Sequence, residues 1–429
     1  MAFAYVMWVI LLLQPQWLVA SLGIKIVVRA MAPLFVILTL LALARYPATR
    51  WYVPLFAVVA LAAATTPFSP NIGLTLLVVR ALALFWCAAV GILTLVRKPR
   101  QAQVIVMVLI LYSYVWWTVN GALPGQVLWH PDLFNYDGFG PLMVGGAAMS
   151  GFAALAIRGR KLKRLALATA LLCIVGLVSS FTRGAFLSAG VVLVFAWIRS
   201  PRKGAMTVGA IVVIAVVWVV GTTIFANVKR QDNATSFFGR ISTISEDVNS
   251  GSGLDRKVIW AAARQIFLSH PVFGVGWAGF GPTAASAFEP GSPVLAGDYA
   301  SNPATLYDKA LHNGYYQVLC EQGLVGVTLW LWLLVDFWWR NAALRKERFR
   351  RVWATETGGS LDLHFVALGL EAGMVAFLAC GYFYNLLTSE WFYGMLITNR
   401  LLYQVLAPLV MAASNGAVAA APGRRSSPP

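Results

Sequence analysis

The chain has 429 residues, of which 59% are hydrophobic and only 11% are charged. Soluble proteins carry about 25% charged residues, so this composition excludes a water-soluble domain as the bulk of the chain. The formal net charge of +17 does not indicate nucleic-acid binding, because the excess of lysine and arginine lies in short loops between apolar runs, as in membrane proteins.

Apolar runs long enough to cross about 30 Å of hydrocarbon recur along the chain. The first run lacks a basic leading region and a small-residue cleavage site, so we expect a retained helix rather than a signal peptide. The predicted fold is an all-α polytopic membrane protein without an internal repeat. We expect about twelve spans, at residues 2–13, 24–44, 52–66, 71–96, 103–119, 138–157, 165–180, 185–198, 205–226, 315–339, 365–385 and 391–411.

Four basic clusters indicate how these helices are oriented. They lie at residues 97–100, 158–164, 199–203 and 340–351. Lysine and arginine accumulate in cytoplasmic loops, so we expect all four clusters and both termini in the cytoplasm. The division that satisfies this rule is nine spans in residues 1–226, an outer loop domain in 227–311, three spans in 312–412 and a cytoplasmic tail in 413–429.

The outer loop, residues 227–311, holds seven basic and seven acidic residues, so it lacks the cytoplasmic charge bias. A loop of this length is usually functional or disordered. Its pattern favours order, because residues 254–269 are predicted to form an amphipathic helix that Pro271 ends. The apolar side of this helix consists of Ile259, Trp260, Ala263, Ile266 and Phe267.

The outer loop also contains Gly-Val-Gly-Trp-Ala-Gly at residues 274–279, the letters of the dinucleotide-binding fingerprint. That fingerprint requires a strand before it and a helix start after it, whereas a predicted helix and a proline precede it here. We therefore interpret it as a flexible loop that lets backbone approach backbone, at a place that can adjoin a ligand. We expect no cofactor or metal, and the four cysteines, all in or beside apolar runs, are interpreted as packing residues.

Two polar residues lie where outer segments enter predicted spans. His312 opens the sequence Leu-His-Asn-Gly-Tyr-Tyr at the end of the outer loop. It is either an interfacial histidine bonded to backbone or a general base, since an unperturbed imidazole titrates near neutrality. Arg183 lies in a turn of residues 181–184 that is too short to be a solvated loop, so it binds either a lipid phosphate or a ligand.

Further arginines lie against the charge rule in the outer loop, at Arg240, Arg256 and Arg264. Guanidinium binds oxyanions bidentately and keeps its proton, so these residues indicate an anionic ligand on the outer side. Arg80 and Arg400 lie within predicted spans, where a charge usually faces the bundle interior. Arg80 can reach toward an outer cavity, and the plain expectation for Arg400 is an ion pair with Glu371.

Several of these segments together resemble the O-antigen ligase and O-antigen polymerase superfamily. The first is Ser180-Phe-Thr-Arg183-Gly-Ala-Phe-Leu187. The second runs from Arg256 through Trp260 and His270-Pro-Val-Phe-Gly-Val-Gly276 to Phe280. The third is His312-Asn-x-Tyr315, followed by Leu319, Glu321, Gly323 and Gly326, and the fourth is Phe134-Asn-Tyr-Asp-Gly-Phe-Gly140.

The resemblance implies a bacterial inner-membrane glycosyltransferase whose outer loop is periplasmic. Such an enzyme passes a glycan from undecaprenyl pyrophosphate to an acceptor hydroxyl, without metal and with inversion. The family's catalytic histidine corresponds to His312, and its pyrophosphate-binding arginines correspond to Arg183, Arg256 and Arg240. Asn313 and Tyr315, which follow the histidine in the motif, are secondary candidates, as are Arg264 and Arg80.

The expected partners are the lipid-linked glycan donor, membrane lipid, and lipid A-core as acceptor, with no nucleic acid. Two alternatives use the same motifs: a polysaccharide polymerase and a ligase that attaches glycans to protein. A third alternative, from another class, is a transporter of the lipid-linked sugar. Transporters usually contain internal repeats and broken mid-membrane helices. Transport also depends on charge within the membrane, so that alternative predicts a larger role for Arg80 or Arg400 than for His312.

Overall fold

The structure, a computed structural model, describes residues 52–121, 136–180, 182–200, 203–227 and 252–419, together with Ala44. Within these ranges the chain is helical, apart from turns and one isolated bridge between Ile157 and Leu361. The elements are α4 (Val53–Thr65), η2 (Thr66–Phe68), α5 (Ile72–Leu95), α6 (Pro99–Gly121), α7 (Tyr136–Ala156), α8 (Arg160–Ser180), α9 (Arg183–Arg199), α10 (Lys203–Asn227), α12 (Ser252–Ser269), α13 (Phe280–Ala287), α14 (Asp298–Ser301), η3 (Pro303–Leu306), α15 (Gly314–Gln317), the π-helical turn η4 (Val318–Gln322), α16 (Gly323–Leu344), α17 (Glu347–Thr357), α18 (Leu363–Gly381) and α19 (Glu390–Ala419).

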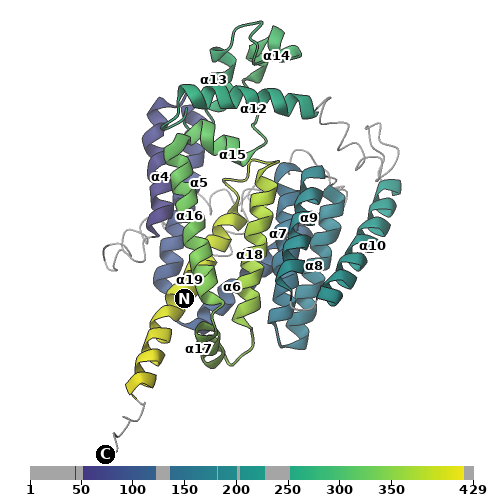
Figure 1. Cartoon of the computed structure of the whole chain (residues 1–429), viewed down its shortest axis with the longest axis vertical. Coiled ribbons are helices and arrows are strands. Elements are labelled where there is room, and N and C mark those ends of the chain that lie inside the picture. The colour runs from purple at the N-terminus through teal and green to yellow at the C-terminus, as the bar shows by residue number, and fades with distance from the viewer. Residues whose placement is uncertain are drawn as a thin grey trace, which may run out of the picture.

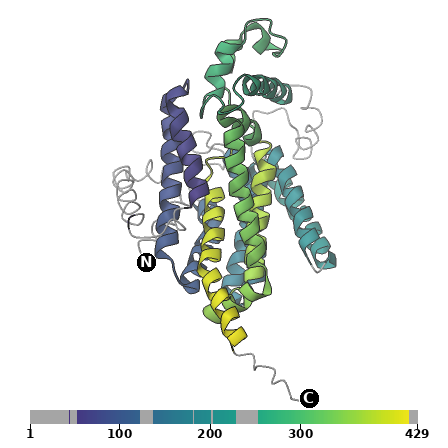
Figure 2. The same cartoon turned by 60° about the vertical axis from the view of Figure 1, so that its left-hand side comes forward.

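The long helices run side by side as a bundle, and a separate layer covers one end of it. Figure 1 shows α12 lying across the top of the bundle with α13 and α14 above it, while α17 lies at the opposite end. The turned view in Figure 2 shows the same arrangement. We call residues 252–311 the cap and the end that they cover the cap end.

Five helical stretches in the described residues are long and apolar enough to cross a membrane: Ile72–Leu95, Phe139–Ala156, Gly314–Leu344, Leu363–Gly381 and Glu390–Asn415. They support a multi-pass, all-α membrane protein. The spans expected at 103–119, 165–180, 185–198 and 205–226 coincide with the helices α6, α8, α9 and α10. The spans expected at 2–13 and 24–44 lie outside the described residues except for Ala44, so the count of twelve stays a prediction.

Small residues in α7 allow neighbouring helices to approach its backbone. A side chain at Gly145 would collide with the ring of Trp391, and one at Gly146 would collide with Ser113. Close approach over small residues is how helices associate in membranes, where apolar side chains gain little by leaving lipid. The glycines of α7 therefore place this helix in the interior of the bundle.

Basic clusters meet at the end of the bundle opposite the cap, which we call the basic end. Arg100 donates a hydrogen bond to the carbonyl of Glu356 (3.1 Å), and the N–H of Arg158 donates to the carbonyl of Ser360 (3.1 Å). Both acceptors lie at or just beyond the end of α17. The basic cluster at residues 340–351 leads into this helix and includes its first turn. Three clusters that the sequence assigns to one side of the membrane thus lie together.

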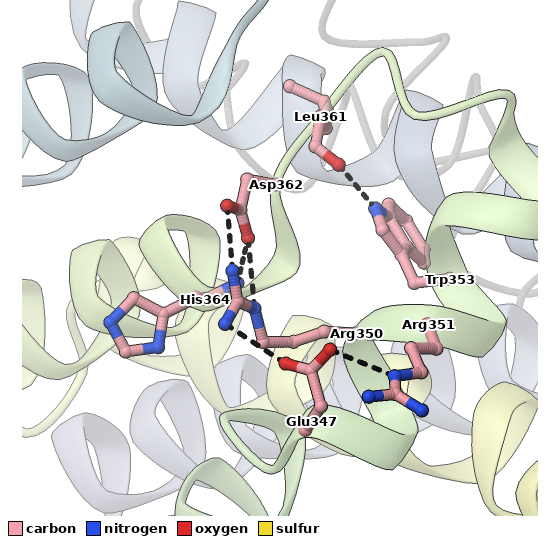
Figure 3. A network of polar contacts seen from close by, with 7 residues as sticks. All are labelled: Glu347, Arg350, Arg351, Trp353, Leu361, Asp362 and His364. Atoms are coloured by element: carbon pink, nitrogen blue, oxygen red, sulfur yellow. Dashed lines mark hydrogen bonds and ion pairs between the residues drawn. The ribbon is translucent and has the colours of Figure 1, made fainter.

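A polar network fixes α17 to the start of α18 at the basic end (Figure 3). Arg350 forms an ion pair with Asp362 (3.1 Å), and Asp362 also accepts the N–H of His364 (2.9 Å) as the N-cap of α18. The indole of Trp353 donates to the carbonyl of Leu361 (2.9 Å). His364 therefore lies at the far end of the bundle from the cap.

Buried charges between the helices correct one expectation. Arg400 forms its ion pair with Asp336 (3.5 Å), not with Glu371 as expected. Glu371 instead pairs with Arg199 and with Arg345 (3.4 Å). The expectation was wrong because α9 and α16 both end beside Glu371, whereas α19 brings Arg400 to the middle of α16. Arg199 belongs to the remaining basic cluster, at residues 199–203, so its pair with Glu371 connects that cluster to the basic end as well.

The cap has a small core of its own, and the predicted amphipathic helix forms its floor. That helix is α12, Ser252–Ser269, which ends two residues before Pro271. Three residues of its predicted apolar side are buried, and Trp260 and Phe267 are half-buried. The core consists of Val258, Ile259, Ala262, Ala263, Ile266, Val275, Phe280, Ala284, Leu295, Tyr299, Leu306, Leu311 and Cys320.

Candidate functional site

The glycine-rich segment at residues 274–279 packs against the π-helical turn η4. The N–H of Val275 donates to the carbonyl of Cys320 (3.0 Å), and the N–H of Gly276 donates to that of Glu321 (2.9 Å). A side chain at Gly274, which has a φ of 65°, would collide with the backbone of residues 320–322. The predicted approach of backbone to backbone is confirmed, and a helix rather than a strand precedes the segment.

Glu321 holds the cap to the bundle from beneath. Its side chain is buried, accepts a hydrogen bond from Gln317 (3.1 Å) and accepts the backbone N–H groups of Ala278 and Phe280. Ala278 has a positive φ of 54° and precedes α13, so the carboxylate fixes a turn that an L-residue rarely adopts. The sequence placed Glu321 in a motif without a role, since only the fold shows what lies above it.

The backbone around His312 is held from two sides. The indole of Trp260 on α12 donates to the carbonyl of Leu311 (2.9 Å), and the N–H of Asn313 donates to the side chain of Asn385 (3.0 Å). His312 itself is half-buried and has a φ of 48°, in the left-handed region. Strained backbone that its surroundings hold in place is a feature of functional sites.

The two residues predicted beside His312 have structural contacts. Asn313 is buried, caps α15 by accepting the N–H groups of Tyr315 and Tyr316, and donates to the carbonyl of Tyr382 (3.0 Å). The hydroxyl of Tyr315 donates to the carbonyl of Leu378 on α18 (2.7 Å). Both residues therefore position the histidine segment against the end of α18.

Aromatic rings join the cap helix α12, the helix α15 and the loop after α18. The ring of Trp260 stacks on that of Tyr316, with centroids 5.7 Å apart, and meets the ring of Tyr382 edge-on at 5.5 Å. We call residues 382–385, which follow α18, the bridging loop. Through Trp260 the cap helix, the start of α15 and the bridging loop form one unit.

The segment that contains Arg183 also packs against the bridging loop. Arg183 is half-buried and is the first residue of α9, so this helix begins two residues earlier than expected. Phe181 of the predicted turn lies outside the described residues. A side chain at the next residue, Gly184, would lie 2.6 Å from Phe383 and 2.9 Å from the hydroxyl of Tyr384. Segments about 130 residues apart, those of Arg183 and His312, thus pack against the same short loop.

The Phe134–Gly140 element adjoins the Arg183 turn. Its first two residues lie outside the described residues, and the rest form the first turn of α7. A side chain at Gly140 would collide with Thr182 and lie 3.1 Å from the hydroxyl of Ser180, and these two hydroxyls hydrogen-bond to each other at 2.7 Å. Two of the motif elements are therefore in contact.

The remaining arginine candidates lie in three different parts of the chain. Arg256 is half-buried one turn before Trp260 on α12, and Arg264 is exposed one turn after it. Both belong to α12, the helix that Figure 1 shows lying across the top of the bundle. Arg80 is exposed on α5. Arg240 lies outside the described residues.

Carboxylate, thiol and imidazole groups do not assemble a metal site within the ranges that the structure describes, since no three of them converge there. The polar groups that converge at the cap end belong to arginine, histidine and asparagine side chains and to backbone. A metal-independent reaction stays an expectation.

Comparison with known proteins supports the resemblance. A family model described as O-antigen ligase matches residues 168–331, from α8 to the middle of α16. The matched range contains Arg183, Arg256 and His312. A search of curated proteins found no match. The match and the motifs within it support the O-antigen ligase superfamily.

Proposed function

We propose that the protein transfers a glycan from undecaprenyl pyrophosphate to an acceptor hydroxyl, with lipid A-core as the first candidate acceptor. The family match supports a ligase or glycosyltransferase activity of this kind. The reaction takes place at the cap end, which in this proposal faces the periplasmic side of a bacterial inner membrane. The gathering of basic clusters at the other end supports this orientation.

His312 acts as general base in this proposal. The imidazole takes the proton of the acceptor hydroxyl while the acceptor oxygen bonds to the anomeric carbon of the donor sugar. The bond from that carbon to the pyrophosphate oxygen breaks, and undecaprenyl pyrophosphate leaves with the electron pair. Attack from the side opposite the leaving group inverts the anomeric centre.

Arginine supplies the counter-charge for the leaving pyrophosphate. Negative charge grows on its oxygens as the glycosidic bond breaks, and fixed guanidinium groups stabilise that charge most where water is excluded. Arg183 and Arg256 are assigned this role, with Arg240 as a third group. Their planar donors suit two oxygens of one phosphate.

One observation carries the proposal: the segments of His312 and Arg183 pack against one bridging loop, and the helix of Arg256 donates to the backbone beside His312. The segments that carry the proposed base and the proposed oxyanion-binding group thus share neighbours, although they are distant in the chain. A lipid-phosphate role for Arg183 alone would not require that arrangement.

The test uses purified protein in lipid nanodiscs with undecaprenyl-pyrophosphate glycan and lipid A-core. We expect His312→Ala to lower the rate of glycan transfer by about 10²- to 10⁴-fold, and Arg183→Ala to lower it as well. Arg183→Lys should recover little, because an ammonium group lacks the bidentate geometry. His364→Ala, at the basic end, is the matched control and should transfer at the wild-type rate.

The acceptor that gains sugar distinguishes the alternatives. Growth of the carrier-bound glycan identifies a polymerase, and labelling of an added protein identifies a protein ligase. Movement of the donor across a liposome membrane without transfer, lost in Arg400→Gln but not in His312→Ala, identifies a transporter. Wild-type transfer by both His312→Ala and Arg183→Ala would refute the proposed mechanism.

A further inference from the structure

An apolar stripe runs along the outer surface of α16. Leu324, Leu331, Val335 and Trp339 are 53%, 55%, 63% and 59% exposed, and their spacing places them on one face of the helix. This helix belongs to a stretch that can cross a membrane. The exposed face is therefore the face that lipid covers.

The stripe continues beyond α16 onto the cap. The turn of residues 268–273, at the end of α12, exposes Leu268, Val272 and Phe273 by 58%, 50% and 56%. Its backbone is fastened to the start of α16, where Leu324 donates to the carbonyl of Pro271 (2.9 Å) and Val325 donates to that of Val272 (3.1 Å). We call residues 268–273 the apolar turn.

Helix lengths give the depth of the apolar turn in the membrane. Arg340 follows Leu324 by 16 residues along α16, which is a rise of about 24 Å at 1.5 Å per residue. The hydrocarbon layer is about 30 Å thick. With Arg340 at the inner boundary, the level of Leu324 and of the turn bonded to it is inside the outer edge of the hydrocarbon.

A second helix gives a similar depth. The hydroxyl of Thr75 on α5 donates to the carbonyl of Trp277, four residues after the turn (2.6 Å). Thr75 lies 20 residues before Leu95, the last residue of α5, which is a rise of about 30 Å. Trp277 is therefore at the outer edge of the hydrocarbon, just above the apolar turn.

Part of the polar backbone of the apolar turn is hydrogen-bonded within the protein. Irregular backbone at membrane level must have its polar groups bonded, because lipid offers no partners. The carbonyls of Pro271 and Val272 accept from α16, and the N–H of Gly274 donates to the carbonyl of His270 (3.1 Å). In water a missing hydrogen bond to these groups can be replaced by solvent, whereas in hydrocarbon it cannot.

We propose that the apolar turn enters the acyl-chain region of the membrane and anchors the cap to the bilayer. The partner of this surface is membrane lipid, argued from the continuity of the turn with the lipid-covered face of α16. The inference goes beyond the proposed function, because it concerns the seating of the cap and needs no glycan. It gives the cap a contact with lipid through the three apolar side chains of a turn that also exposes Ser269 and His270.

The test places a fluorescent probe in the turn. The four native cysteines are buried, so an environment-sensitive fluorophore on Phe273→Cys reports from the turn alone. Ser286→Cys on α13, an exposed position in the upper cap, is the matched control. Both are reconstituted in nanodiscs that contain either plain phospholipid or phospholipid with a spin-label quencher on the acyl chain.

We expect blue-shifted emission and strong loss of fluorescence with acyl-chain quencher for the probe at residue 273, and neither for the probe at 286. Quenching of the probe at 273 by aqueous iodide, with no response to the acyl-chain quencher, would overturn the proposal. If Phe273→Cys is not monodisperse, Leu268→Cys on the same turn replaces it. The outcome is independent of glycan transfer, so failure of either proposal leaves the other distinguishable.

Discussion

The cap end and the basic end of this protein are held together by different forces. At the basic end, charged side chains pair with each other, as in the contacts of Glu371 with Arg199 and Arg345 and of Arg350 with Asp362. At the cap end, side chains bond to backbone, as Trp260 and Glu321 do. At the basic end the arginines contribute to stability. At the cap end the hydrogen bonds position the segments around His312, the proposed general base.

The largest expected effect tests the basic end. Glu371→Ala removes the buried carboxylate that pairs with Arg199 and Arg345. Breaking a buried ion pair costs about 3–5 kcal/mol of folding stability. We expect a clearly lower thermal unfolding temperature in detergent, followed by circular dichroism. A variant with unchanged stability would mean that the charges at this end are solvated rather than paired.

A second prediction separates position from stability at the cap end. Glu321→Ala removes the acceptor of two backbone N–H groups, and each unsatisfied buried donor costs about 1–3 kcal/mol. We expect the rate of glycan transfer to fall clearly, while the unfolding temperature of the bundle changes little. Glu321→Gln keeps one acceptor oxygen and should recover part of the transfer rate, whereas equal loss in both variants would argue for a role of the charge itself.

Trp260→Phe should have a smaller effect, because it keeps the ring contacts and removes one hydrogen bond to the carbonyl of Leu311. A typical bond of this kind contributes about 0.5–1.5 kcal/mol. We expect faster amide hydrogen exchange in residues 311–316, measured by mass spectrometry, with exchange in α17 unchanged. Equal acceleration at both ends would show that the two regions are coupled.

The smallest effect is expected at the surface of the basic end. Glu347 pairs with Arg350 and Arg351 (3.0–3.3 Å), but its side chain is 58% exposed. Such pairs contribute about 0–1 kcal/mol. Glu347→Ala should therefore leave the unfolding temperature nearly unchanged, and a loss as large as that of Glu371→Ala would remove the distinction between buried and exposed pairs.

Much of this architecture was predictable because its signals are local. Hydropathy over about twenty residues predicts helices such as α5 and α18, and it predicts α9 to within two residues of its observed start at Arg183. The helix α12 follows from its apolar spacing and from Pro271. The division of the chain into spans, outer loop and tail stays a prediction.

The candidate site was predictable as a set of residues and not as an arrangement. His312 and Arg183 were selected one by one, for their chemistry, their position and their motifs. Nothing in the sequence indicated that the bridging loop, residues 382–385, contacts both segments, because it lies about 70 residues from one and 200 from the other. Asn385 and Glu321 were missed as positioning residues for the same reason.

By itself the sequence determined the membrane class, the long helices of the bundle, α12 and the grouping of basic clusters, and its short motifs indicated the family that the match supports. Only the tertiary structure decided that Arg400 pairs with Asp336, that the bridging loop joins two motifs and that an apolar turn continues the lipid-covered face of α16. The physical reason is that these contacts depend on how helices are rotated and staggered against each other, which no local pattern specifies.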